Sequence, residues 1–126
     1  MTIEEIKEEC ERMQSYLEIT TTDDTNELVG RLTDINVYLA RSGFLLAEAR
    51  LMQDKATQAV FSHYTDALVK MPSNTAKQFI SSATADINYV VNWLDRLNRA
   101  CVHQGDNLRT QISFSKEELK LTRSGY

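Results

Sequence analysis

Residues 94–111, which read LDRLNRACVHQGDNLRTQ, contain the residue types from which reactive centres and ligand sites are built. A cysteine and a histidine can form a nucleophilic pair or bind a metal ion, and arginines can bind phosphate. However, Cys101 and His103 are two positions apart, so on a helix they point about 200° from one another. The sequence also has no HExxH, CxxC, GxxxxGK[ST] or GxGxxG motif. We therefore expect a protein that is not an enzyme, with no metal ion and no cofactor.

Both cysteines fall on apolar helical stripes. Cys10 and Cys101 are far apart in the chain and form no disulfide framework, so we expect buried free thiols, as in a reducing cytoplasm. The first ten residues, MTIEEIKEEC, are acidic and lack the apolar segment of a signal peptide. No apolar run approaches membrane-spanning length. These features predict a cytoplasmic protein without a membrane contact.

The basic residues of the second half allow two interpretations. Arg96, Arg99 and His103 share one helix face by their spacing of three and four. They are either a solvated surface with local ion pairs such as Asp95–Arg99, or part of a surface that follows a phosphate backbone. In the second case Trp93 and Tyr89 on the same helix could stack on bases, although either residue more often belongs to a core.

Charge is distributed unevenly along the chain. Residues 1–30 hold nine acidic residues against two basic ones, a net charge of −7, whereas residues 31–126 hold twelve basic against nine acidic residues, a net charge of +3. Acidic pairs such as Glu4 and Glu8 are typical of solvated helix faces. As an alternative, the acidic first helix would be a surface for a basic protein partner, with Glu4, Glu5, Glu8 and Glu9 as the contact residues.

Apolar spacing of three and four residues predicts three helices, over residues 2–18, 24–70 and 74–121. The third has the most regular stripe, which comprises Ile80, Ala83, Ile87, Val90, Leu94, Leu97 and Cys101. Because glycine weakens a helix by about 1 kcal/mol relative to alanine, we expect breaks near Gly43 and Gly105.

These elements predict an all-α fold in one domain, residues 1–126. Pro72 separates the second and third helices, which would fold back on each other as a long antiparallel hairpin, with the first helix packed on it as a helical bundle. A hairpin of two helices cannot bury both of its faces, and one short helix covers only part of one. We therefore expect a homo-oligomer.

Two stretches resemble the UvsY-like family of phage recombination mediators. They are VYLARSGFLLAEARLMQDKATQAVFSHY, residues 37–64, and INYVVNWLDRLNRACVHQGDNLRTQI, residues 87–112. The resemblance implies an all-helical ring that binds single-stranded DNA and helps to load a recombinase. Carried over by position, it implies DNA contacts by Arg50, Lys55, Arg96, Arg99 and Arg109. The chain departs from the family in its less basic middle helix and its more acidic first helix.

Three hypotheses follow from the sequence. The first is a phage or prophage accessory protein of recombination or replication that binds single-stranded DNA and a recombinase or another protein. The second is a protein-binding adaptor, or a phage-encoded inhibitor of host defence, that acts through its acidic N-terminal helix. The third is a small structural or assembly protein without a ligand.

Overall fold

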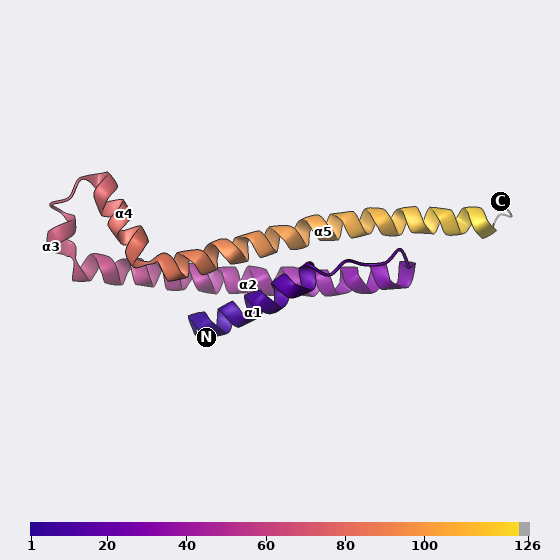
Figure 1. Ribbon diagram of the computed structural model, residues 1–126, viewed down its shortest axis with the longest axis horizontal. Coiled ribbons are helices and arrows are strands. Elements are labelled where there is room, and N and C mark those ends of the chain that lie inside the picture. Colours follow the sequence, from indigo (N-terminus) through magenta and orange to yellow (C-terminus); the bar gives the residue numbers. More distant parts are fainter. Residues whose placement is uncertain (124–126) are drawn as a thin grey trace.

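The computed structural model describes residues 1–123, and all regular structure within them is helical (Figure 1). The five helices are α1 (Ile3–Leu17), α2 (Thr25–His63), α3 (Thr65–Leu68), α4 (Ser73–Ala83) and α5 (Ala85–Arg123). The predicted all-α class is therefore confirmed for the described part of the chain.

Side-chain caps define where α1 and α2 begin. Thr2 Oγ1 accepts a hydrogen bond from the backbone N–H of Glu5 at 3.2 Å. Asp24 Oδ2 accepts one from the N–H of Glu27 at 3.1 Å. Each cap satisfies a backbone donor that has no partner within the first helical turn. The predicted starts near residues 2 and 24 agree with these positions.

The breaks that the sequence predicts near Gly43 and Gly105 are wrong, since α2 and α5 run through both glycines. Gly105 is buried, and a Cβ built there would lie 3.8 Å from Cγ2 of Ile35. Burying one large aliphatic side chain contributes about 1.5–3 kcal/mol, which outweighs the helix penalty of a single glycine. Packing between the two long helices therefore keeps both of them continuous.

The interruptions occur instead at Tyr64 and Thr84, so the predicted helices 24–70 and 74–121 are each divided in two. At the second interruption Thr84 is buried, and its Oγ1 donates to the carbonyl oxygen of Ile80 at 2.9 Å. The interruption is a change of backbone geometry at Thr84, with φ −110° and ψ 20°, and the N–H of Thr84 still bonds the carbonyl oxygen of Ile80 at 3.0 Å. The short helices α3 and α4 form a separate lobe at one end of the molecule (Figure 1).

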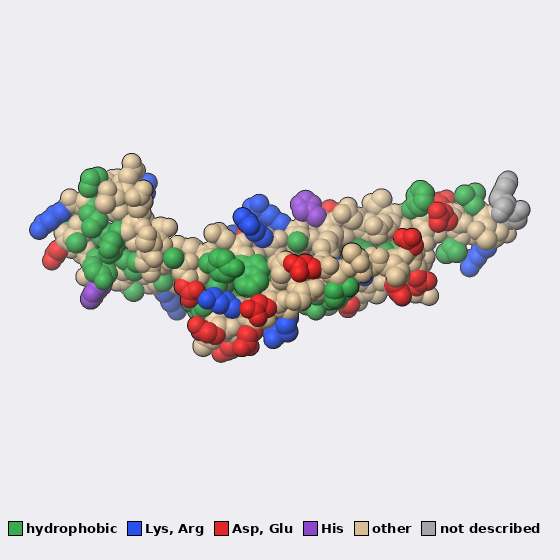
Figure 2. Space-filling view, in the orientation of Figure 1, with side chains coloured by type: hydrophobic (Ala, Val, Ile, Leu, Met, Phe, Trp, Pro, Cys, Tyr) green, Lys and Arg blue, Asp and Glu red, His purple; other side chains and the backbone are tan. Residues whose placement is uncertain are grey.

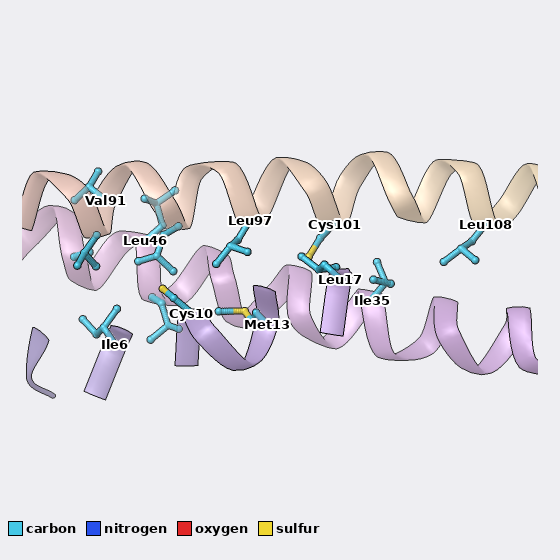
Figure 3. Packing of buried hydrophobic residues seen from close by; sticks show 14 of the residues in the cluster. Ile6, Cys10, Met13, Leu17, Ile35, Leu46, Val91, Leu97, Cys101 and Leu108 are labelled. Carbon is cyan, nitrogen blue, oxygen red and sulfur yellow. The ribbon is translucent and has the colours of Figure 1, made fainter. Parts of the chain in front are cut away.

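Helices α2 and α5 lie side by side in opposite directions, and α1 packs along them (Figure 1). Their buried apolar side chains form one core, seen from close by in Figure 3. From α1 it includes Ile6, Cys10, Met13 and Leu17; from α2 Leu28, Ile35, Leu45, Leu46 and Ala49; and from α5 Ile87, Val90, Val91, Leu94, Leu97, Cys101, Leu108 and Ile112. The predicted stripe of the third helix is buried from Ile87 to Cys101, whereas Ile80 is half-buried and Ala83 is exposed.

A buried arginine joins the three main helices. Arg31 of α2 is 8% exposed and donates to Gln104 Oε1 of α5 at 3.1 Å. Its guanidinium lies 4.5 Å from the ring centre of Tyr16 in α1. Gln104 in turn donates to the carbonyl oxygen of Leu17 at 2.9 Å, so the C-terminal end of α1 is held at a fixed place on α2 and α5.

Candidate nucleic-acid and protein interfaces

A shallow groove on α5 combines two aromatic rings with an arginine. It is lined by Tyr89, Asn92, Trp93 and Arg96. The rings of Tyr89 and Trp93 are 5.7 Å apart between centroids and tilted by 58°. Trp93 donates from its indole nitrogen to Gln14 Oε1 of α1 at 3.1 Å, which fixes the ring against the rod. Tyr89 is 61% exposed, so its ring remains open to a ligand.

Arg96 lines this groove and Arg99 lies next to it, both on the face of α5 that points away from α2. Figure 2 shows a group of Lys and Arg side chains next to a histidine over the middle of α5. Arg99 pairs with Asp95 at 3.0 Å, and its side chain is 73% exposed. Arg96 is exposed and makes no ion pair with any residue that the structure describes. Both arginines are exposed residues of α5, three positions apart in the chain.

The other three basic candidates lie elsewhere. Arg50 and Lys55 are exposed residues of α2, five positions apart and thus about 140° apart around the helix. Arg109 lies about 15 Å along α5 from Arg99 and pairs with Asp106 at 3.0 Å. The five residues that the resemblance implies as DNA contacts are therefore not gathered into one surface.

The four acidic residues proposed as a partner surface also divide into two pairs. Glu9 binds Arg41 of α2 through both carboxylate oxygens, each at 2.8 Å, and Glu5 is part of the cap with Thr2. The hydrogen bond from Arg41 lowers the pKa of Glu9, against the opposing effect of burial. Glu4 and Glu8 are exposed and share the outward face of α1 with Glu11. Figure 2 shows acidic side chains gathered over this helix.

An apolar stripe on the outward face of α2 was not predicted from the sequence. It consists of Val37, Ala40, Phe44, Ala47 and Leu51, all of them exposed. We call these five residues the outer α2 stripe. Its three large members, Val37, Phe44 and Leu51, are 64%, 52% and 50% exposed. The five residues are spaced by three and four positions, as is the buried stripe on the opposite side of the same helix. This spacing is the signal in the sequence that could have revealed the outer α2 stripe.

The two cysteines are buried free thiols, as predicted. Burial raises the pKa of Cys10 to about 11, with smaller contributions from Glu9 and Glu11, and burial also raises the pKa of Cys101. Since the thiolate is the nucleophile, neither side chain is poised for catalysis. Among residues 1–123 no group of three or more His, Cys, Asp or Glu side chains is arranged to hold a metal ion.

Comparisons with protein-family models, with curated proteins and with solved structures give no match for this chain. None of the helices within residues 1–123 combines the length and apolarity needed to span a membrane.

Proposed function

We propose that this chain is a non-enzymatic, oligomeric accessory protein of phage or prophage recombination or replication, which acts in the cytoplasm and binds single-stranded DNA and partner proteins. The groove formed by Tyr89, Asn92, Trp93 and Arg96 carries the DNA part of the proposal. It combines stacking surfaces, an amide and a cation within two helical turns, which is the chemistry that a flexible nucleic-acid strand requires.

Tyr89, Arg96 and the neighbouring Arg99 each have a role in this account. The exposed ring of Tyr89 stacks on a base, and such contacts contribute about 1–3 kcal/mol per base irrespective of sequence. Arg96 binds a phosphate, since its guanidinium has no competing carboxylate among the described residues. Arg99 binds the next phosphate by exchanging its exposed bond to Asp95, because a surface ion pair of this kind contributes at most about 1 kcal/mol.

At Trp93 the α1 helix presents the amide of Gln14, and Glu18 accepts a hydrogen bond from that amide at 2.7 Å. Gln14 is the residue that bonds Trp93, and it lies ten positions from Glu4, or about 15 Å along the helix. The exposed acidic residues Glu4 and Glu8 lie in the N-terminal half of α1, beside the start of α5, where Lys7 pairs with Asp86 at 2.7 Å. A strand that follows the outward face of α5 from Tyr89 towards His103 avoids them.

Titration with oligothymidine, followed by the fluorescence of the single tryptophan, tests the DNA proposal. Two phosphate contacts per protein chain predict a slope of about −1.4 when log Kobs is plotted against log salt concentration. The double variant Arg96→Glu/Arg99→Glu should lose binding, while Arg12→Glu, an exposed arginine of α1, should retain it. Absence of binding at low salt, or equal loss in both variants, would contradict this use of the groove.

The exposed acidic residues of α1 support a second candidate, the protein-binding adaptor or inhibitor. Glu4, Glu8 and Glu11 repeat at four and three residues and form a continuous acidic face that could bind a basic protein. Of the four predicted contact residues, Glu4 and Glu8 remain available to a partner, since Glu5 and Glu9 form hydrogen bonds within the chain. Binding of poly-L-lysine should fall in Glu4→Lys/Glu8→Lys and persist in Glu117→Lys/Glu118→Lys. Equal effects of the two variants would remove the specific role of α1.

A further inference from the structure

The outer α2 stripe has the pattern of a coiled-coil seam. Val37, Phe44 and Leu51 recur at seven residues, and Ala40 and Ala47 occupy the intervening positions at three and four. All five lie on the side of α2 opposite the core residues Ser42 and Ala49, which are 0% exposed. The guanidinium of Arg41 lies 5.3 Å from the ring centre of Phe44, and all five residues remain exposed. A seam with this spacing is suited to another helix lying nearly along it.

A row of alternating charge flanks this seam. Asp34, Arg41, Glu48 and Lys55 recur at seven residues and follow the stripe on one side, so that the signs along the helix are minus, plus, minus, plus. In an antiparallel pair of identical helices, residues of this flank on one helix meet residues of the same flank on the other. Because the signs of this row are inverted when it is read backwards, two antiparallel copies of it place opposite charges next to each other.

We propose that the outer α2 stripe pairs with the α2 helix of a second copy of this chain, antiparallel and about a two-fold axis between residues 45 and 46. In this register Phe44 faces Ala47 of the second copy, and Ala40 faces its Leu51. Phe44 and Leu51 thus each meet an alanine, an arrangement that lets two helices pack closely, while Val37 meets Asp54 at the end of the seam. The interface is isologous and closes as a dimer.

The flanking charges select this register. Arg41 meets Glu48 of the second copy, and Asp34 meets its Lys55, with each pair separated by about 3 Å along the helix axis. By symmetry the dimer holds four such pairs. Moving one helix by seven residues places Arg41 against Arg41 in one direction and Glu48 against Glu48 in the other. A parallel pair places Arg50 against Lys55. Repulsion between these like charges disfavours the shifted registers and the parallel pair.

The intramolecular contacts of the chain are compatible with this dimer. Glu9 binds Arg41 through Nε and Nη2, which leaves Nη1 for the carboxylate of a second copy. Asp34 accepts a hydrogen bond from the Tyr16 hydroxyl through Oδ2 at 2.9 Å, which leaves Oδ1 for Lys55 of the second copy. The α5 helix lies on the opposite side of α2, and the DNA groove faces away from α2 altogether. The proposed function includes an oligomer, and this dimer is the contact that would build it. Formation of the dimer does not depend on DNA binding.

Sedimentation equilibrium of the full chain, without DNA, tests the proposal. We expect a concentration-dependent dimer of twice the 14.4 kDa chain mass. Phe44→Asp should weaken it by at least about tenfold, because a charge is then buried in the seam. Lys55→Glu should weaken it by a similar factor, since it faces Asp34 of the second copy.

The double variant Asp34→Lys/Lys55→Glu restores opposite charges across the interface and should recover dimerisation. Circular dichroism checks that all variants stay helical, as expected for substitutions at exposed positions. A monomer at all concentrations, a ring of higher order, or a dimer that Phe44→Asp leaves intact would overturn the proposal. Because the DNA titration uses Arg96 and Arg99, failure of one proposal is distinguishable from failure of the other.

Discussion

Asn98 of α5 donates a hydrogen bond from Nδ2 to Oγ of Ser42 in α2 at 3.0 Å, within the buried layer between the two long helices. Ser42 is 0% exposed and itself donates to the carbonyl oxygen of Leu39 at 3.0 Å. A polar contact inside an apolar seam fixes the register of two helices, because any shift leaves its members unpaired. This contact sets the axial position of α5 along α2.

A double-mutant cycle with Asn98→Ala and Ser42→Ala measures the contact. We expect a coupling free energy of about 0.5–1.5 kcal/mol from urea unfolding, the usual range for a neutral hydrogen bond. A control cycle combines Asn98→Ala with Ser113→Ala, a change at a distant exposed residue. The two changes in unfolding free energy should simply add. Additivity in both cycles would show that the bond contributes nothing to stability.

Alanine at the two interior glycines should stabilise the protein. A Cβ at position 43 would have its nearest contact, Asn98 Nδ2, at 3.7 Å, and one at position 105 would have Arg109 Nη1 at 3.6 Å. Both are ordinary contact distances. Gly43→Ala and Gly105→Ala should therefore each raise the free energy of unfolding by about 0.5–1 kcal/mol, because alanine loses less conformational entropy in a helix.

Gly30→Ala is the matched control, since no atom lies within 4 Å of its added Cβ. It should give a gain of the same size. If Gly105→Ala destabilises while Gly30→Ala stabilises, the helices approach more closely at residue 105 than the contact distances indicate.

The Glu9–Arg41 pair predicts a pH dependence of stability. The hydrogen bond from Arg41 lowers the pKa of Glu9 from its ordinary value of 4.5. A carboxylate with a lowered folded-state pKa contributes stability above its unfolded pKa, and this contribution disappears as the pH falls through the folded value. Glu9→Gln should therefore reduce the free energy of unfolding near neutral pH, and the difference from the unmodified chain should shrink below about pH 4.

Urea unfolding at a series of pH values measures this difference. Glu8→Gln, one position away and exposed, serves as the control and should change stability by less than about 0.5 kcal/mol. A Glu9→Gln difference that stays constant down to acidic pH would mean that the ion pair does not carry it.

Thiol modification should report on the docking of α1. With the pKa of Cys10 raised to about 11, only about one thiol in a thousand is ionised at pH 8, and the group is also 0% exposed. Ellman's reagent should therefore modify both native cysteines slowly, and quickly only after urea is added. An exposed thiol introduced by Ser113→Cys should react at once. Fast reaction of Cys10 in the folded chain would contradict stable docking of α1.

The sequence predicts the fold well where periodicity is decisive. The stripe from Ile87 to Cys101 and the row from Ile6 to Leu17 are buried, because each residue returns to the same helix face every three or four positions. Interruptions are harder to predict. Glycine at positions 43 and 105 is a weak local signal that packing overrides. The threonine at position 84 is no signal either, since Thr33 and Thr110 make the same side-chain bond within continuous helices.

The candidate interfaces were predictable in part. The spacing of Arg96 and Arg99 places them together, and the spacing of Arg50 and Lys55 separates those two, but no local pattern shows that Glu9 binds Arg41. The outer α2 stripe was hidden by its composition. Two of its five members are alanines, and the same helix also carries a buried apolar stripe, so one apolar face obscured the other.

Residue-specific crosslinking tests the second apolar face of α2 most directly. Cys10 and Cys101 are both 0% exposed and do not interfere in the folded chain. In the proposed register the position of Ala40 faces Leu51 of the second copy and is about 16 Å from its own equivalent along the axis. A mixture of Ala40→Cys and Leu51→Cys should form a mixed disulfide dimer under mild oxidation, and Ala40→Cys alone should not crosslink. Efficient crosslinking of Ala40→Cys with itself, or none in the mixture, would contradict the antiparallel pairing of α2.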